Sequence, residues 1–206
     1  MNKRDFPSEE YNDLSDKDWH LSRKKFMQLL LLSGVAAQLP WLQSCSVDEE
    51  TIGDTSPLSL EQFKVVREVQ QILFPDDGNG PGAKQINADN YLLWVLRDPL
   101  ADANETNYII KRIDQFISTC KKEMGSDFLS LSATNQFQFV KFVASEGWGD
   151  KWFSRLIIHI LEALLLDPVY GGNTNKTGWE WLEHNPGLPR PTAKLIYPEI
   201  LKFHAV

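Results

Sequence analysis

The sequence is poor in the residues that build common metal and redox centres. Its 206 residues include two cysteines, Cys45 and Cys120, and four histidines, and neither a CxxC nor a CxxCH pattern occurs. The absence of both patterns excludes a zinc ribbon, a dithiol redox pair and a covalently attached haem. Cys120 lies on the apolar face of a predicted helix, where we expect a buried free thiol. We predict no metal site on this chain.

Positive charge is also scarce. The chain has 21 lysines and arginines against 28 acidic residues, a net charge of -7, and its body carries no basic cluster. Binding to phosphates depends on such clusters, so we expect no nucleic-acid partner. A hydrophobic content of 42% with 24% charged residues is typical of a globular protein. The length fits one ordinary domain with additional segments.

Familiar catalytic patterns are missing as well. Gly171-Gly172 is not followed by GK[ST], so it is not a phosphate loop, and no nucleophile elbow occurs. The segment Asp76–Gly80 lacks the acid spacing of a calcium loop, and we interpret it as a polar turn. His159 and Glu162 share a helix face but lack further metal ligands, so a hydrogen bond is the simpler interpretation. We predict that the chain is not an enzyme on its own and carries no cofactor.

Residues 1–44 have the composition of an export signal. A basic cluster precedes an apolar run that is too short and too broken for a transmembrane helix but suits a signal peptide. The stretch SRKKFMQ is similar to the twin-arginine export motif, through Ser22, Arg23, Lys24 and Phe26. Lys24 stands where that motif has its second arginine, and lysine is not equivalent to arginine. Twin-arginine export and general secretion are therefore both open.

The leader ends in LQSC, which resembles a lipoprotein box with Cys45 as the lipidated residue. Lipid on Cys45 would anchor the chain to a membrane without a spanning helix. Residues 45–58 are predicted to be a linker. Its SVDEE stretch resembles an acidic tag that directs some Gram-negative lipoproteins to the outer leaflet. The alternative is that this stretch is only a solvated part of the linker. We expect a periplasmic or surface-exposed lipoprotein in the envelope of a Gram-negative bacterium.

Residues 59–206 are predicted to form an all-α domain, a compact bundle of about five helices with an irregular C-terminal loop and tail. Ser59 and Gln62 form a capping box at the first helix, and Gly125 is a C-cap for the third. Apolar periodicity predicts helices over 59–74, 88–98, 109–124, 132–145 and 150–166. The last is apolar on nearly all sides, which indicates a position at the centre of the bundle.

The loop DPVYGGNTNKTGWEW, residues 167–181, joins turn-forming residues to aromatic ones. Gly171 and its neighbour Gly172 would turn the chain, and Asn173 would hold the turn by bonding to nearby backbone. Tyr170, Trp179 and Trp181 would bind a partner as aromatic anchors. Alternatively, the two tryptophans would fill the core of the domain itself. The sequence leaves both interpretations open.

Three features in this order resemble the gluconate 2-dehydrogenase subunit 3 family. They are the leader with its lipid-type cysteine, the segment EQFKVVREVQQILFPDDGNGPGA, and the segment LEALLLDPVYGGNTNKTGWEWLEHNPG. The last is the most specific. The residues that fit its pattern are Asp167, Pro168, Tyr170, Gly171, Gly172, Asn173, Gly178 and Trp179.

The resemblance implies a small, non-catalytic subunit that binds a large FAD-containing dehydrogenase of the glucose-methanol-choline type, with or without a cytochrome c subunit. It also implies that this subunit escorts the folded large subunit through the twin-arginine pore. FAD would lie on the partner, and the eight matching residues with Trp181 would form the partner-binding site. A competing hypothesis is a cell-surface sugar-binding lipoprotein, with Tyr170, Trp179 and Trp181 as a stacking platform.

Overall fold

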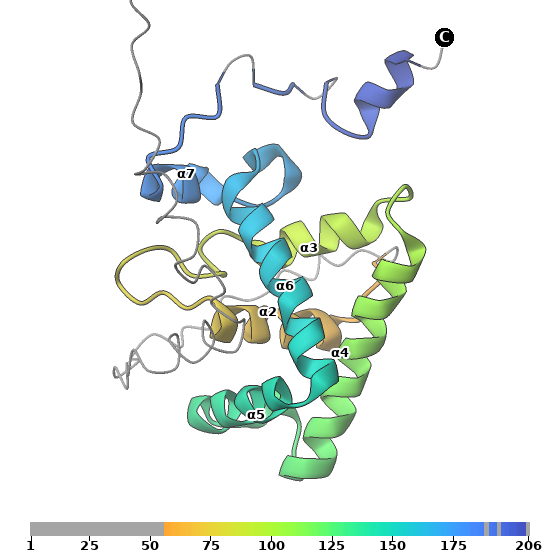
Figure 1. The fold of residues 1–206 in the computed structure, drawn as a ribbon, viewed down its shortest axis with the longest axis vertical. Coiled ribbons are helices and arrows are strands. Elements are labelled where there is room, and N and C mark those ends of the chain that lie inside the picture. Colours follow the sequence, from red (N-terminus) through yellow and green to blue (C-terminus); the bar gives the residue numbers. More distant parts are fainter. Residues whose placement is uncertain (1–55, 188–189, 193–194, 205–206) are drawn as a thin grey trace, which may run out of the picture. The chain divides into compact units, whose positions relative to one another are not determined.

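The computed structural model describes residues 56–187, 190–192 and 195–204. The predicted leader, with Cys45 and the export motif, lies outside these residues. The described part contains six α-helices and no strand, which confirms the all-α prediction (Figure 1). The helices are α2 (Leu60–Leu73), α3 (Ala88–Arg97), α4 (Ala103–Met124), α5 (Ala133–Ser145), α6 (Gly147–Leu165) and the short α7 (Thr177–Trp181). Short 3-10 helices are η2 (Phe128–Ser130), η3 (Pro168–Tyr170), η4 (Thr174–Lys176) and η5 (Glu199–His204).

Local capping signals set several helix ends. Ser59 Oγ accepts from the backbone N–H of Gln62 at 3.2 Å, and Gln62 Oε1 accepts from the N–H of Ser59 at 2.8 Å, which confirms the capping box. Gly125 ends α4 in the left-handed conformation, as predicted. The start of α4 lies earlier than expected, because the Asp102 carboxylate caps the helix through the N–H of Asn104 at 2.8 Å.

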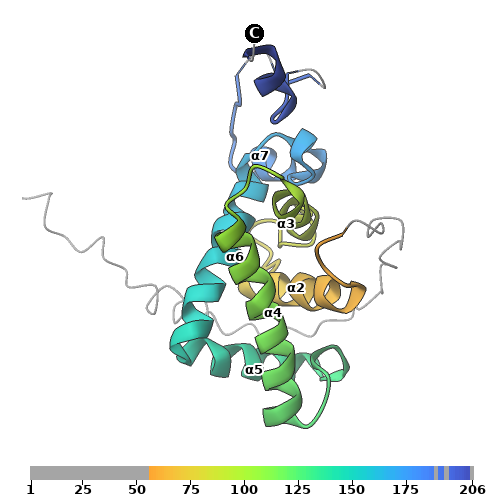
Figure 2. The same ribbon diagram turned by 90° about the vertical axis from the view of Figure 1, so that its right-hand side faces the viewer.

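The inner face of α6 lies at the centre of the bundle. This helix packs against each of α2, α3, α4, α5 and α7. Figures 1 and 2 show α5 lying across the ends of α4 and α6 that are farthest from α7. Trp152 on α6 is fully buried, and its ring lies 5.3 Å from that of Phe116 on α4. Phe128 and Phe139 belong to the same aromatic cluster, each with its ring 4.9 Å from that of Phe116.

In the part of the chain that the structure describes, no other helix covers the outer face of α6. We expected this helix to be surrounded, because it is apolar on nearly all sides, and for the outer face that expectation is wrong. Ile158, Leu161 and Leu165 are each more than two-fifths exposed. Trp152 and Leu156, on the opposite side of the helix, are fully buried. Within the described residues, no helix combines the length and the apolar character needed to cross a membrane.

Candidate functional site

The residues predicted to bind a partner form one loop, residues 167–181, which we call the signature loop. It contains η3, η4 and α7, and it closes the C-terminal end of α6. The last carbonyls of a helix lack N–H partners within the helix. Here the Leu165 carbonyl accepts from Trp179 Nε1 at 2.7 Å, and the Leu166 carbonyl accepts from Asn173 Nδ2 at 3.1 Å. Side chains of the signature loop therefore cap α6.

Asn173 holds both ends of the signature loop together. It is fully buried and adopts a left-handed conformation, with φ 47° and ψ 44°, which asparagine tolerates better than most residues. Besides its bond to Leu166, its Oδ1 accepts from the backbone N–H of Gly178 at 2.8 Å. One side chain thus joins the end of α6 to the start of α7, in the role expected from the sequence.

The glycines of the signature loop allow its backbone to approach α6. A Cβ on Gly172 would lie 2.9 Å from the Cα of Ala163. A Cβ on Gly178 would lie 2.3 Å from the carbonyl oxygen of Leu164. Gly171 has a φ of +89°, which side-chain-bearing residues rarely adopt. The loop could not pack on α6 in this way with larger residues.

The two tryptophans of the signature loop have different surroundings. Trp179 is only 5% exposed and belongs to the core. Trp181 is 42% exposed, and its Nε1 donates to the carbonyl of Asn79 in the loop between α2 and α3. Its ring lies against Gly80, where an added Cβ would overlap it. Since Trp179 is buried, the three-ring platform required by the sugar-binding hypothesis is not formed.

Tyr170 contacts other parts of the chain. Its ring lies 5.0 Å from that of Trp94 on α3, and its hydroxyl oxygen accepts from the backbone N–H of Tyr197 at 3.5 Å. Trp94 also contacts Tyr197, with their ring centroids 6.2 Å apart. The signature loop is therefore joined both to α3 and to the C-terminal tail.

Asp167 makes a second connection to the tail. Its carboxylate accepts from Arg190 Nε at 2.9 Å and Nη2 at 2.8 Å, and it caps η3 through the N–H of Val169 at 3.1 Å. The Arg190 guanidinium also lies over the Trp179 ring, 5.2 Å from its centroid. Hydrogen bonds from Arg190 hold the pKa of Asp167 below its usual value. This carboxylate is ionised and paired within the chain.

The His159–Glu162 pair forms a hydrogen bond, as the simpler interpretation predicted. His159 Nδ1 lies 2.9 Å from Glu162 Oε2, and the Tyr91 hydroxyl donates to the same oxygen at 3.2 Å. The bond to His159 lowers the pKa of Glu162, whereas burial and then the nearby Glu162 charge raise that of Tyr91. In the part of the chain that the structure describes, no group of three His, Cys, Asp or Glu side chains is placed to hold a metal.

Two further interpretations are confirmed. The Asp76 carboxylate accepts from the N–H of Gly78 at 3.1 Å, and that of Asp77 accepts from the N–H of Asn79 at 2.9 Å, so this segment is a polar turn. Cys120 is a buried free thiol. Burial raises its pKa.

The sequence matches the family model described as Gluconate 2-dehydrogenase subunit 3 over residues 60–187. The chain belongs to this family. The match extends from the first residue of α2 to beyond the signature loop, so it includes all six α-helices described above. No curated protein and no solved structure gives a significant match. By its description, the family is a subunit of a dehydrogenase, and we regard this chain as an accessory subunit that associates with other subunits.

Four of the nine predicted partner-binding residues of this family member are buried. Gly172, Asn173, Gly178 and Trp179 are buried, and Asp167, Pro168 and Tyr170 are partly exposed, leaving Gly171 and Trp181 as the exposed members. The buried residues fix the conformation of the loop. Mainly the exposed and partly exposed signature residues are accessible for direct contact with another subunit.

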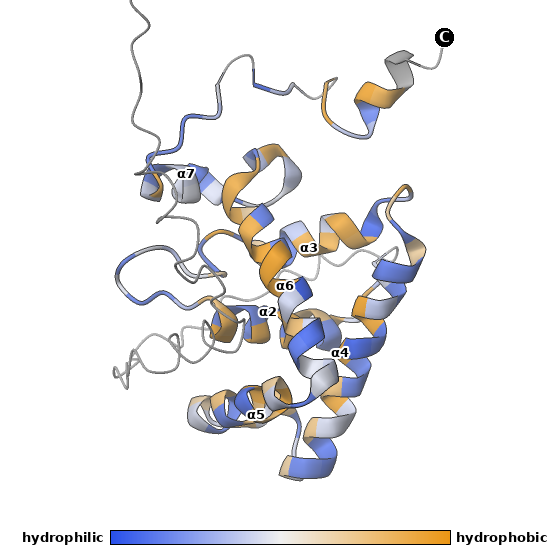
Figure 3. Cartoon of the chain, in the orientation of Figure 1, coloured by the Kyte–Doolittle hydropathy of each residue, from blue (hydrophilic) through white to orange (hydrophobic). Residues whose placement is uncertain are grey.

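The sequence interpretation missed a group of exposed aliphatic side chains on the C-terminal half of α6 and in the turn that follows it. We call this group the outer stripe, and its members with their exposed fractions are Ile158 (46%), Leu161 (43%), Leu165 (46%), Leu166 (39%) and Val169 (41%). Figure 3 shows the apolar colour over the C-terminal half of α6 and the turn that follows. The spacing of residues 158, 161 and 165 could have indicated one helix face.

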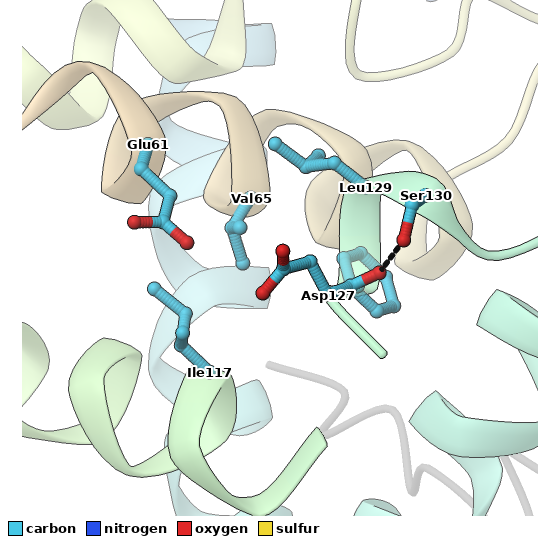
Figure 4. A pocket seen from close by; sticks show the side chains of 7 residues that line it. Glu61, Val65, Ile117, Asp127, Leu129 and Ser130 are labelled. Carbon is cyan, nitrogen blue, oxygen red and sulfur yellow. Dashed lines mark hydrogen bonds between the residues drawn. The ribbon is translucent and has the colours of Figure 1, made fainter. Parts of the chain in front are cut away.

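A hollow of about 330 Å³ lies away from the signature loop, between α2, α4 and η2 (Figure 4). Val65 and Ile117 line it, with the carboxylates of Glu61 and Asp127 beside them. Lys121 Nζ lies 3.8 Å from Glu61 and 3.1 Å from Asp127, so both carboxylates are paired within the chain. No residue of the signature loop lines this hollow.

Proposed function

We propose that this chain is the non-catalytic accessory subunit of a complex whose large subunit is an FAD-containing dehydrogenase of the glucose-methanol-choline type. The observation that carries the proposal is the family match, which spans the helical domain and the signature loop together. In this proposal, FAD and the catalytic residues belong to the large subunit. The present chain supplies a binding surface, with or without a cytochrome c subunit beside it.

The geometry of the signature loop supports a binding role. Asn173 and the glycines attach the loop to α6, and Arg190 attaches it to the tail. A loop held in this way loses little conformational entropy on binding, which favours affinity. Trp181 and Tyr170 are amphipathic aromatic residues of the type that contribute most at interfaces.

We further propose that the chain escorts the large subunit out of the cytoplasm. The motif Ser22, Arg23, Lys24 and Phe26 precedes the apolar run of the leader, and the twin-arginine route moves folded proteins. A large subunit that already holds FAD could then leave the cytoplasm bound to this chain. Cys45 would carry the lipid that keeps the complex at the membrane of a Gram-negative envelope.

Deletion of the chain tests the escort role. The large flavoprotein is followed by cell fractionation in cells with and without this subunit. We expect it in the envelope fraction of wild-type cells and in the cytoplasm of the deletion strain. A large subunit that reaches the envelope equally well in both strains would refute the escort role.

Two substitutions in the leader identify the export route. Arg23→Lys keeps the charge but removes the guanidinium, so it should stop twin-arginine export of both subunits. Lys3→Gln, distant from the motif, is the matched control and should leave export unchanged. Normal export of the Arg23→Lys variant would indicate general secretion.

Cys45→Ser should release the exported chain from the membrane fraction.

A further inference from the structure

Two side chains of the signature loop hold an arginine of the C-terminal tail. The Arg190 guanidinium donates to the Asp167 carboxylate through Nε at 2.9 Å and Nη2 at 2.8 Å, and it lies over the Trp179 ring, 5.2 Å from the centroid. A carboxylate can accept two N–H bonds from one guanidinium, and the face of an indole ring attracts its positive charge. Together the two side chains have the chemistry of a guanidinium-binding site.

Bonds within the domain position both of these side chains. The Asp167 carboxylate accepts from the N–H of Val169 at 3.1 Å, and Trp179 Nε1 donates to the carbonyl of Leu165 at 2.7 Å. Neither bond involves the tail. A site whose residues are fixed by their own neighbours keeps its geometry when the ligand leaves. We therefore expect the site to persist when the tail is released.

The tail is attached at the surface of the domain. Residues 181–187, which lead to it, are exposed, and none of the tail residues whose burial the structure describes, 190–192 and 195–201, is buried. Leu195 and Leu201 are 50% and 47% exposed, although both are apolar. A segment that buries so little apolar surface can detach while the core stays closed.

A second contact lies further along the tail. The backbone N–H of Tyr197 donates to the Tyr170 hydroxyl at 3.5 Å, and the Tyr197 ring lies near that of Trp94, with the centroids 6.2 Å apart. This hydrogen bond is longer than the usual 2.7–3.2 Å, whereas both bonds from Arg190 lie within that range. Arg190 is therefore the stronger of these two attachments.

We propose that Asp167 and Trp179 form a guanidinium-binding site occupied in cis by Arg190, and that the tail is a strap that can leave this site while the domain stays folded. Both residues of the site lie within the family match, whereas the strap begins beyond residue 187, where the match ends. Once the strap has left, the site is open to an arginine side chain of another polypeptide. Neither the site nor the strap depends on which subunit the chain binds, so failure of the tests below would leave the function proposed above intact.

Hydrogen–deuterium exchange in the full-length chain tests the strap. Arg190→Ala should raise the exchange rate of residues 195–201 at least about fivefold and change that of α6 and α7 less than about twofold. Arg155→Ala, which removes the ion pair with Glu105 at 3.1 Å, is the matched control and should leave exchange of the tail unchanged. Faster exchange of α6 or α7 together with the tail would show that the tail belongs to the folded core, and an unchanged tail would show that Arg190 does not hold it. Either result would overturn the inference.

Chemical rescue of the same variant tests the site. In full-length Arg190→Ala, millimolar methylguanidinium should shift the NMR signals of the Trp179 indole saturably, since it can bond to the carboxylate and stack on the ring. Methylammonium at the same concentration lacks a planar face and should shift them about threefold less. Saturation should be absent in the wild type, where Arg190 fills the site, and in Arg190→Ala combined with Asp167→Asn. No response of the single variant, an equal response to both cations, or an equal response of the wild type would contradict the guanidinium site.

Discussion

Replacement of Asn173 by alanine should destabilise the chain by about 4 kcal/mol. The buried N–H of Gly178 would lose its acceptor, at about 2 kcal/mol, and the partly buried carbonyl of Leu166 would lose its donor, at about 1 kcal/mol. Alanine in the left-handed conformation adds about 1 kcal/mol. This total is a large fraction of the 5–15 kcal/mol by which domains are usually stable.

Asn175 provides the matched control for this prediction. It also adopts a left-handed conformation, with φ 56°, but its side chain is exposed. Asn175→Ala should therefore cost only about 1 kcal/mol. Urea unfolding of both variants, followed by circular dichroism, gives the two free energies of unfolding. Equal losses in the two variants would refute the claim that Asn173 joins the signature loop to α6.

Three further predictions concern stability. Gly178→Ala should cost about 3 kcal/mol, since its Cβ would overlap the α6 backbone. Gly147→Ala, in open space, should be neutral or slightly stabilising in the same urea assay. The Asp167–Arg190 pair lowers the pKa of the folded carboxyl, so its contribution is present above the unfolded pKa near 4 and is lost as pH falls through the lower folded value. The stability difference between wild type and Arg190→Gln should accordingly be constant near neutral pH and shrink below about pH 4, and a pH-independent difference would contradict the pairing. Ser59→Ala should cost about 1 kcal/mol in thermal unfolding through loss of the capping box, and no change would show that the cap contributes nothing.

Local sequence signals predicted the helices and several of their ends. A capping box and a C-terminal glycine act within a few residues of the backbone they satisfy, so Ser59 and Gly125 could be interpreted without knowledge of the fold. The same holds for Asn173, whose bonding partners are seven and five residues away. Such short-range causes are visible in a single sequence.

The buried face of a helix was harder to predict. On α5 the buried residues are Phe139, Val140 and Val143, whereas Phe137 is exposed, although all four are apolar. On α6 nearly every side is apolar, so periodicity does not show which face the other helices cover. The choice depends on tertiary packing, and the outer stripe was missed for this reason.

The burial of the two tryptophans of the signature loop could not be predicted from the sequence for the same reason. Trp179 contacts the end of α6 within the local sequence, whereas Trp181 rests on Asn79 and Gly80, about one hundred positions earlier in the chain. No local pattern distinguishes these surroundings. The sequence therefore left open which ring belongs to the core and which to the surface.

Purification of the full-length chain from the envelope of its native host tests the central claim most directly. Our account predicts that a large polypeptide copurifies in about equal amount, carries FAD and oxidises a sugar or sugar acid with an electron-accepting dye. Recovery of the chain without a flavoprotein, or of a chain that performs this oxidation alone, would contradict it.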